Sequence, residues 1–268
     1  FGAVGTVDAV ASGSIFVTAS DDIGTVTADG GYVRVDSNFG AIDVVDATGE
    51  AGVVVQASDN IGEVTASGYF VDVDSYSGDI GTVTANTLGA GTDGATVTVD
   101  AHMGGITSVD ATAGDDIRVN ANDDIGSVTA TAIGDAADVV VASVTGNIGT
   151  VVADASDDIY VEAMQGTITS VTATAEDGYV EVLAEDVTSV TATAGGDSAG
   201  DFRGAGDIYV QASSGGSVGS VVGNASDDFV VQASSDIGSV TGVGDSLLVN
   251  AGGSVQTVDV EIMAGDDI

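Results

Sequence analysis

Valine recurs along the chain at a nearly constant spacing, inside short apolar segments such as Ile23–Ala28 (IGTVTA). The valines that share the position of Val26 are Val7, Val45, Val64, Val83, Val109, Val128, Val151, Val171, Val190, Val221, Val240 and Val258. Successive steps are 19, 19, 19, 19, 26, 19, 23, 20, 19, 31, 19 and 18 residues, so that seven of the twelve are 19. A fixed period of this size predicts one supersecondary unit that stacks on copies of itself.

Each period contains two segments in which β-branched and polar residues alternate, as in Ile23–Ala28 and Ile117–Ala121 (IRVNA). This alternation predicts half-buried strands, and helical spacing occurs nowhere. Two strands and two turns in about 19 residues predict one coil of an all-β, right-handed parallel β-solenoid with two sheets, resembling a β-helix or β-roll. We expect about 13 such coils, with Val26, Ala28, Val33 and Val35 pointing inward and Thr25, Thr27, Arg34 and Asp36 pointing outward.

Three coils exceed the period by four or more residues, and their extra residues fall around positions 86–95, 131–138 and 194–206. All three insertions are predicted to lie between a first and a second strand, and therefore at one edge, which is often the edge that makes contacts. We interpret residues 1–268 as a single solenoid without capping segments. It is expected to be part of a longer repeat protein, because uncapped ends need neighbouring coils or other copies to cover them.

The composition narrows the possible partners. The chain has 42 acidic and 3 basic residues and a formal net charge of -39, with no cysteine, proline or tryptophan. A hydrophobic content of 44% is too high for a disordered acidic tail. Nucleic acids and anionic lipids are excluded as partners, because binding to them relies on Lys and Arg. No apolar segment approaches the ~20 residues that span a bilayer, so we expect no membrane insertion.

Aspartates gather in the turns before both strands. Those that we predict to be metal ligands are Asp21, Asp22, Asp59, Asp79, Asp115, Asp116, Asp123, Asp124, Asp157, Asp158, Asp207, Asp227, Asp228 and Asp236. Stacked carboxylates ~4.8 Å apart repel each other by about 1 kcal/mol in water and by more at lower dielectric. Several calcium ions would relieve this repulsion, since Ca²⁺ prefers carboxylate and carbonyl oxygens. Alternatively, Asp stands there because tight turns favour it, and salt screens the charge.

Two columns of outward side chains are predicted on the strands. The second strand carries Asp36, Gln56, Asp74, Asp100, Asn120, Glu162, Gln211, Gln232 and Asn250, which are expected to form structural hydrogen-bonded ladders. The first strand carries Ser or Thr on both sides of its central valine, an array similar to the face of ice-binding β-solenoids. The only histidine, His102, is expected in a solvated turn, and no set of residues indicates an enzyme.

With its period, its two strands per coil and acidic turns such as Ser20-Asp21-Asp22-Ile23, the chain resembles secreted bacterial β-solenoid repeat proteins. These include the calcium-binding β-roll domains of exported toxins and surface layers, and large repeat adhesins. The β-roll motif Gly-Gly-x-Gly-x-Asp does not occur here, so the ligand positions of that family cannot be transferred. The resemblance implies a secreted or cell-surface protein that depends on calcium.

We therefore expect a non-enzymatic structural protein that forms a rigid, cation-stabilised rod in an extracellular assembly, either a surface layer or a filament. Its expected partners are divalent cations and other copies of itself, or neighbouring coils of the same long chain. Two alternatives remain, the stalk of a bacterial adhesin and an ice-binding solenoid.

Overall fold

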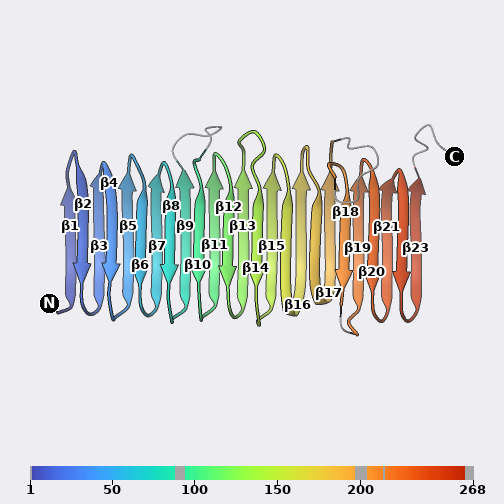
Figure 1. The fold of residues 1–268 in the computed structure, drawn as a ribbon, viewed down its shortest axis with the longest axis horizontal. Coiled ribbons are helices and arrows are strands. Elements are labelled where there is room, and N and C mark those ends of the chain that lie inside the picture. The colour runs from blue at the N-terminus through green and yellow to red at the C-terminus, as the bar shows by residue number, and fades with distance from the viewer. Residues whose placement is uncertain (1, 88–93, 197–203, 214, 263–268) are drawn as a thin grey trace. The chain divides into compact units, whose positions relative to one another are not determined.

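The computed structural model describes residues 2–87, 94–196, 204–213 and 215–262. The chain divides into two compact units, unit 1 from Phe1 to Gly134 and unit 2 from Asp135 to Ile268. Both units are built from β-strands joined by turns, and the described residues contain no helix (Figure 1). The fold is a parallel β-solenoid of about 13 coils, which confirms the predicted class.

Unit 1 alternates first strands and second strands along the chain. Its first strands are β1 (Val4–Val10), β3 (Ile23–Gly30), β5 (Ile42–Gly49), β7 (Ile61–Gly68), β9 (Ile80–Thr87), β11 (Ile106–Ala113) and β13 (Ile125–Ala132). Its second strands are β2 (Ser14–Ala19), β4 (Tyr32–Ser37), β6 (Val53–Ala57), β8 (Val71–Ser75), β10 (Val97–Ala101) and β12 (Ile117–Ala121). Among the described residues of unit 1, first strands pair with first strands and second strands with second strands, in parallel.

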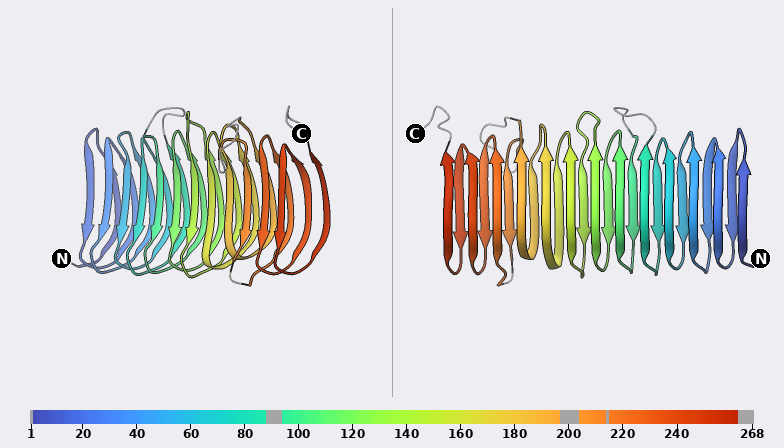
Figure 2. Two further views of the ribbon diagram at one scale, coloured as in Figure 1. Left: turned by 45° about the vertical axis from the view of Figure 1, so that its right-hand side comes forward. Right: turned by 180° about the vertical axis from the view of Figure 1, so that it is seen from behind.

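Unit 2 repeats this arrangement. Its strands are β14 (Val139–Ser143), β15 (Ile148–Ala155), β16 (Ile159–Ala175), β17 (Val180–Ala194), β18 (Ile208–Ala212), β19 (Val218–Ala225), β20 (Asp228–Ala233), β21 (Ile237–Gly244), β22 (Ser246–Ala251) and β23 (Val255–Ile262). The strands β16 and β17 are long because each continues from a second strand through the turn into the next first strand, as the views in Figure 2 show.

The recurring valines pair with one another in register, as the period predicts. The pairs link Val7, Val26, Val45, Val64, Val83, Val109 and Val128 in unit 1, and Val151, Val171, Val190, Val221, Val240 and Val258 in unit 2. Parallel strands that repeat in register place identical side chains above one another. The predicted stacking of the valines is therefore confirmed within each unit.

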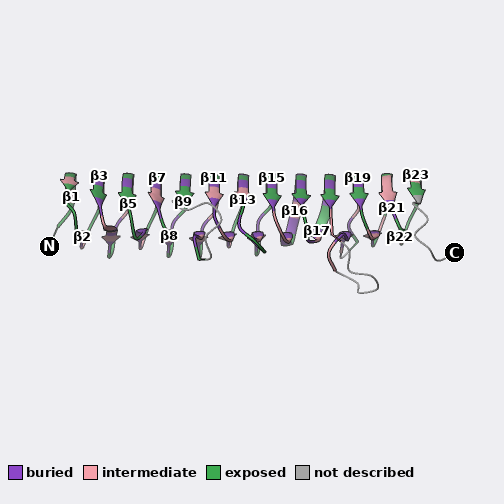
Figure 3. Ribbon diagram, turned by 90° about the horizontal axis from the view of Figure 1, so that it is seen from above, coloured by how far each residue is buried: buried purple, intermediate pink, exposed green. Residues whose placement is uncertain are grey.

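The core of each unit lies between its sheet of first strands and its sheet of second strands, which form two layers in Figure 3. Val26, Val33 and Val35 have no exposed surface, and Ala28 retains 4%. Full burial of one Val or Ile side chain stabilises the fold by about 1.5–3 kcal/mol. Outward residues of the first sheet, such as Thr27, are exposed, whereas those of the second sheet, such as Arg34, are half-buried.

One coil of unit 2 has an unusual core. Phe229 occupies an inward position that holds Ile208 in the neighbouring coil, and its side chain is fully buried. The facing sheet carries glycine instead of alanine there, at Gly223 and Gly242. A Cβ on Gly223 would lie 2.6 Å from Cζ of Phe229, closer than atoms can pack. The two glycines therefore make the room for the ring.

The insertions partly follow the prediction. The connection between β9 and β10 runs from 88 to 96, and that between β17 and β18 from 195 to 207, so both lie between a first and a second strand. Their residues 88–93 and 197–203 lie outside the described residues. The connection between β18 and β19 is also longer, 213–217 against 122–124 between β12 and β13. The prediction that all extra residues of this coil lie at one edge is therefore wrong.

Candidate functional site

We call the residue directly before the first inward apolar side chain of a strand the turn-closing residue, as Asp22 is before Ile23. In many coils this residue forms the same contact. Its side-chain oxygen accepts a hydrogen bond from the backbone amide of the turn-closing residue in the following coil. Before first strands the pairs are Asp22 with Ala41 (3.0 Å), Asn60 with Asp79 (2.7 Å), Asp79 with Gly105 (2.9 Å), Asn147 with Thr167 (2.9 Å), Asp186 with Ser217 (2.7 Å) and Asp236 with Ser254 (2.8 Å). Before second strands they are Asp138 with Asp158 (3.1 Å), Asp158 with Tyr179 (3.0 Å) and Asp207 with Asp228 (2.9 Å).

These contacts explain why Asp and Asn stand at the turns. Because the chain bends at the turn, no backbone carbonyl is in place to accept the amide of the turn-closing residue in the following coil. The oxygen of a short Asp or Asn side chain accepts it instead. In the Asp21-Asp22 pair the second carboxylate makes this bond. At Asp236 the backbone amide and the hydroxyl of Ser254 both donate to Oδ1, and they lower the pKa of the carboxyl group. In several of the aspartates that were predicted to bind metal, one side-chain oxygen is therefore used for a hydrogen bond within the turns.

The two kinds of turn differ in their exposure to water. All predicted ligands in the turns before first strands are exposed, namely Asp21, Asp22, Asp59, Asp79, Asp123, Asp124 and Asp236. Those in the turns before second strands are half-buried or buried, namely Asp115, Asp116, Asp157, Asp158, Asp207, Asp227 and Asp228. Charge is costlier to bury than to expose, so the second group is more strongly affected by its neighbours.

The structure brings three carboxylates together before the second strands of unit 2. Among the described residues, Asp138, Asp157 and Asp158 form the one group in which one carboxylate oxygen of each residue lies within 4.8 Å of those of the other two. The pKa of Asp158 is raised to about 6, mainly by burial and also by the charges of Asp157 and Asp138, while the hydrogen bond from Tyr179 offsets part of this rise. The folded chain therefore holds negative charge at this point against a free-energy cost.

Such a group fits the chemistry of calcium, which binds six to eight oxygen ligands in flexible geometry. Asp138 and Asp158 each accept a turn-closing bond at Oδ1, and these bonds hold both carboxylates at the turn. Sequence reasoning had identified Asp157 and Asp158 but missed Asp138, because Asp138 lies at the end of an insertion. The signal was present, since Asp138 precedes Val139 as Asp158 precedes Ile159.

The raised pKa of Asp158 gives a pH dependence with a definite sign. The folded-state pKa of about 6 exceeds the ordinary value of 3.8, so the folded protein binds this proton more tightly than the unfolded chain does. The resulting contribution to the free energy of unfolding is fully present at low pH and is lost as pH rises through about 6. This pKa shift corresponds to a free energy of about 3 kcal/mol. Because the group is half-exposed, solvent screening reduces the effect on the free energy of unfolding to roughly 1 kcal/mol.

In calcium-free buffer, Asp158→Asn is therefore expected to unfold at higher urea than the wild type at pH 7 and at the same urea at pH 4. The exposed Asp245→Asn removes an equal charge from unit 2 and serves as the control. Parallel pH profiles for Asp158→Asn and the wild type would contradict the shift.

A second, more open group lies in unit 1. Asp79, Asp123 and Asp124 line one shallow depression at the turns before β9, β11 and β13, together with Gly105 and Thr107. Their side chains are exposed, and the turn-closing bond to Gly105 uses one oxygen of Asp79. The other predicted ligands lie in turns along the coils without forming a comparable three-carboxylate group in the part of the chain that the structure describes.

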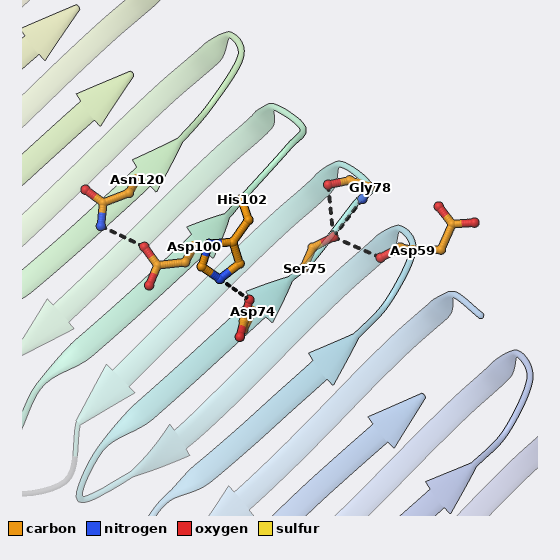
Figure 4. A network of polar contacts seen from close by, with 7 residues as sticks. All are labelled: Asp59, Asp74, Ser75, Gly78, Asp100, His102 and Asn120. Carbon is orange, nitrogen blue, oxygen red and sulfur yellow. Dashed lines mark hydrogen bonds and ion pairs between the residues drawn. The ribbon is translucent and has the colours of Figure 1, made fainter. Parts of the chain in front are cut away.

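The predicted polar column on the second sheet exists as a stacked series. In unit 1 Asp36, Gln56, Asp74, Asp100 and Asn120 pair in register. Asn120 donates to Asp100 at 2.7 Å (Figure 4). Arg34 donates to Asp36 at 2.7 Å and to Gln56 at 2.6 Å. The column is therefore stacked as expected, but the predicted ladder is confirmed only in part: Asn120 bonds directly to Asp100, Arg34 from the same sheet links Asp36 and Gln56, and Asp74 and Asp100 repel each other.

The single histidine is more engaged than the sequence indicates. His102 lies in the turn after β10 with its side chain 53% exposed, and its Nε2 is 3.0 Å from Oδ1 of Asp74 (Figure 4). Burial raises the pKa of Asp74, and the Asp100 charge also raises it, whereas His102 lowers it. This contact gives Asp74 a side-chain partner in an acidic stretch of the column.

Comparison of the chain with protein-family models, curated proteins and solved structures gives no match. Among the described residues, no helix has the length and apolar character needed to cross a membrane.

Proposed function

We propose that this chain is a non-enzymatic structural protein, a cation-stabilised segment of an extracellular assembly such as a surface layer or a filament. The observation that carries the proposal is the unbroken register of the valine column within each unit. Every coil is supported by its neighbours through backbone hydrogen bonds and a continuous core, so stability grows with the number of coils. That construction suits a protein that supplies stiffness.

The acidic turns support the cation part of the proposal. A formal charge of -39 weakens the compact state by self-repulsion. Asp138, Asp157 and Asp158 concentrate this repulsion at one half-buried point. Calcium sites of extracellular modules bind at about 10⁻⁴–10⁻³ M, an affinity suited to a few carboxylates and water. We therefore place one calcium ion at this group and weaker binding along the exposed turns.

Calcium is expected to raise the melting temperature of the chelator-treated protein in a saturable manner, because an ion that binds only the folded state stabilises it by mass action. The measurement is thermal unfolding followed by circular dichroism at constant high NaCl, so that general screening does not change. Asp157→Asn should reduce the calcium-dependent rise, whereas Asp245→Asn, an exposed aspartate of the same unit, should leave it intact.

An unchanged melting temperature on calcium addition would contradict the cation site, and NaCl alone would then account for the screening. The assembly role is tested separately, by electron microscopy of the purified protein with calcium. Ordered sheets or filaments are expected. Isolated particles would contradict the assembly and favour the stalk of an adhesin.

A further inference from the structure

The outward face of the first sheet in unit 2 carries no charge over four consecutive coils. The segments 168–174, 187–193, 218–224 and 237–243 contain no Asp, Glu, Lys or Arg. They pair in register in β16, β17, β19 and β21, so their outward side chains form straight columns. We call these outward side chains the neutral face; its exposed members include Thr172, Thr174, Thr191, Thr193, Val222 and Thr241.

The same face of unit 1 is acidic. Its first strands place Asp29, Asp43, Asp46, Glu63 and Asp110 at outward positions, and all five are exposed. Thr191 of the neutral face holds the strand position that Asp46 and Asp110 hold in unit 1, directly after the recurring valine. The fold therefore accepts a carboxylate at this position, and the lack of charge in unit 2 is not imposed by the geometry of the coil.

The side chains of the neutral face are small and mostly β-branched. Val222 is 45% exposed, and Thr172 and Thr191 stand in the same column in the preceding coils. Ser239 donates a hydrogen bond to Ser220 at 3.1 Å between neighbouring coils. Short side chains lose little rotamer entropy when they are covered, so this face can be buried at a low cost.

We propose that the neutral face is the contact between two copies of this chain, packed face to face around a two-fold axis. Two molecules of charge -39 repel each other at any acidic surface, and burying an unpaired carboxylate would add a large desolvation cost. The neutral face avoids both penalties. Because each copy uses the same surface, the contact closes as a dimer and does not propagate.

The size of the face sets the strength of the dimer. Four coils spaced ~4.8 Å apart, with strands of about seven residues at ~3.3 Å each, give roughly 450 Å² per copy. The total of about 900 Å² is below the usual size of a stable interface, so the contact is a weak one that depends on protein concentration. Salt is expected to strengthen it, because screening reduces the repulsion between the remaining charges of the two copies.

Sedimentation velocity of the full chain tests the proposal, in chelator and high NaCl, so that the result is independent of calcium. We expect a concentration-dependent monomer–dimer equilibrium for the wild type. Thr191→Asp should weaken the dimer at least tenfold, since the two-fold axis brings carboxylates of both copies into the contact. Thr65→Asp is the matched control, because Thr65 is an exposed threonine at the same strand position in unit 1, beside Asp46.

Circular dichroism is measured on both variants to establish that they fold. A wild type that stays monomeric at all concentrations overturns the proposal, and if it also shapes growing ice crystals, the face binds ice instead. Equal weakening by Thr191→Asp and Thr65→Asp also overturns it. Because no calcium is present, these outcomes leave the cation test of the proposed function unaffected.

Discussion

Gly223→Ala is expected to lower the free energy of unfolding by about 1–3 kcal/mol, the usual cost of overpacking a core. The added Cβ would lie 2.6 Å from Cζ and 2.8 Å from Cε2 of Phe229, so the buried ring would have to move. Urea-induced unfolding followed by circular dichroism measures the change.

The cost should depend on the phenylalanine. Phe229→Ile restores the side chain found in the neighbouring coil at Ile208, and in that background Gly223→Ala should be neutral or stabilising, because it fills space that the ring no longer occupies. A double-mutant cycle gives the coupling directly. Phe229→Ala alone is expected to cost about 3–5 kcal/mol. Additive effects of Gly223→Ala and Phe229→Ile would show that the ring and the glycine are independent.

Ser75→Ala is expected to destabilise unit 1 by about 1–3 kcal/mol, although it removes a single oxygen atom from the core. The hydroxyl of Ser75 is completely buried, lies 2.9 Å from the carbonyl oxygens of Asp59 and Gly78, and accepts the amide of Gly78 at 3.2 Å (Figure 4). Alanine would leave these turn groups without that partner. Thermal and urea unfolding measure the loss.

Ser77→Ala is the control, because Ser77 is exposed in the same turn and its loss should change stability by less than about 0.5 kcal/mol. Equal effects of the two substitutions would show that the buried hydroxyl has no special role.

The register of the fold could be predicted because one residue type recurs at one spacing. Val26, Val45 and Val64 follow one another by 19 residues, and alternation within each strand assigns inward and outward sides. Both signals are local, and the structure confirms them in each unit. The positions of the turns followed from the same spacing.

Other features depend on contacts between coils, which a single sequence does not display. Ser75 stands in a column that holds Ala57 and Ala101 in the neighbouring coils. From the residue type alone, its buried hydroxyl and the contacts that this hydroxyl makes with the turn could not be predicted. Asp138 was hidden by the insertion before it. The turn-closing role of Asp158 could not be predicted either, because the amide that donates to it belongs to Tyr179, a full coil away.

A chain of nearly identical coils faces one characteristic folding error: a strand can pair one coil out of step and still cover valine with valine. The bulky coil of unit 2 discriminates against this error. The ring of Phe229 needs Gly223 and Gly242 opposite it, and a shift would set it against an alanine such as Ala192. The steric clash of this ring with alanine therefore disfavours pairing that is one coil out of step, and favours one order of otherwise similar coils.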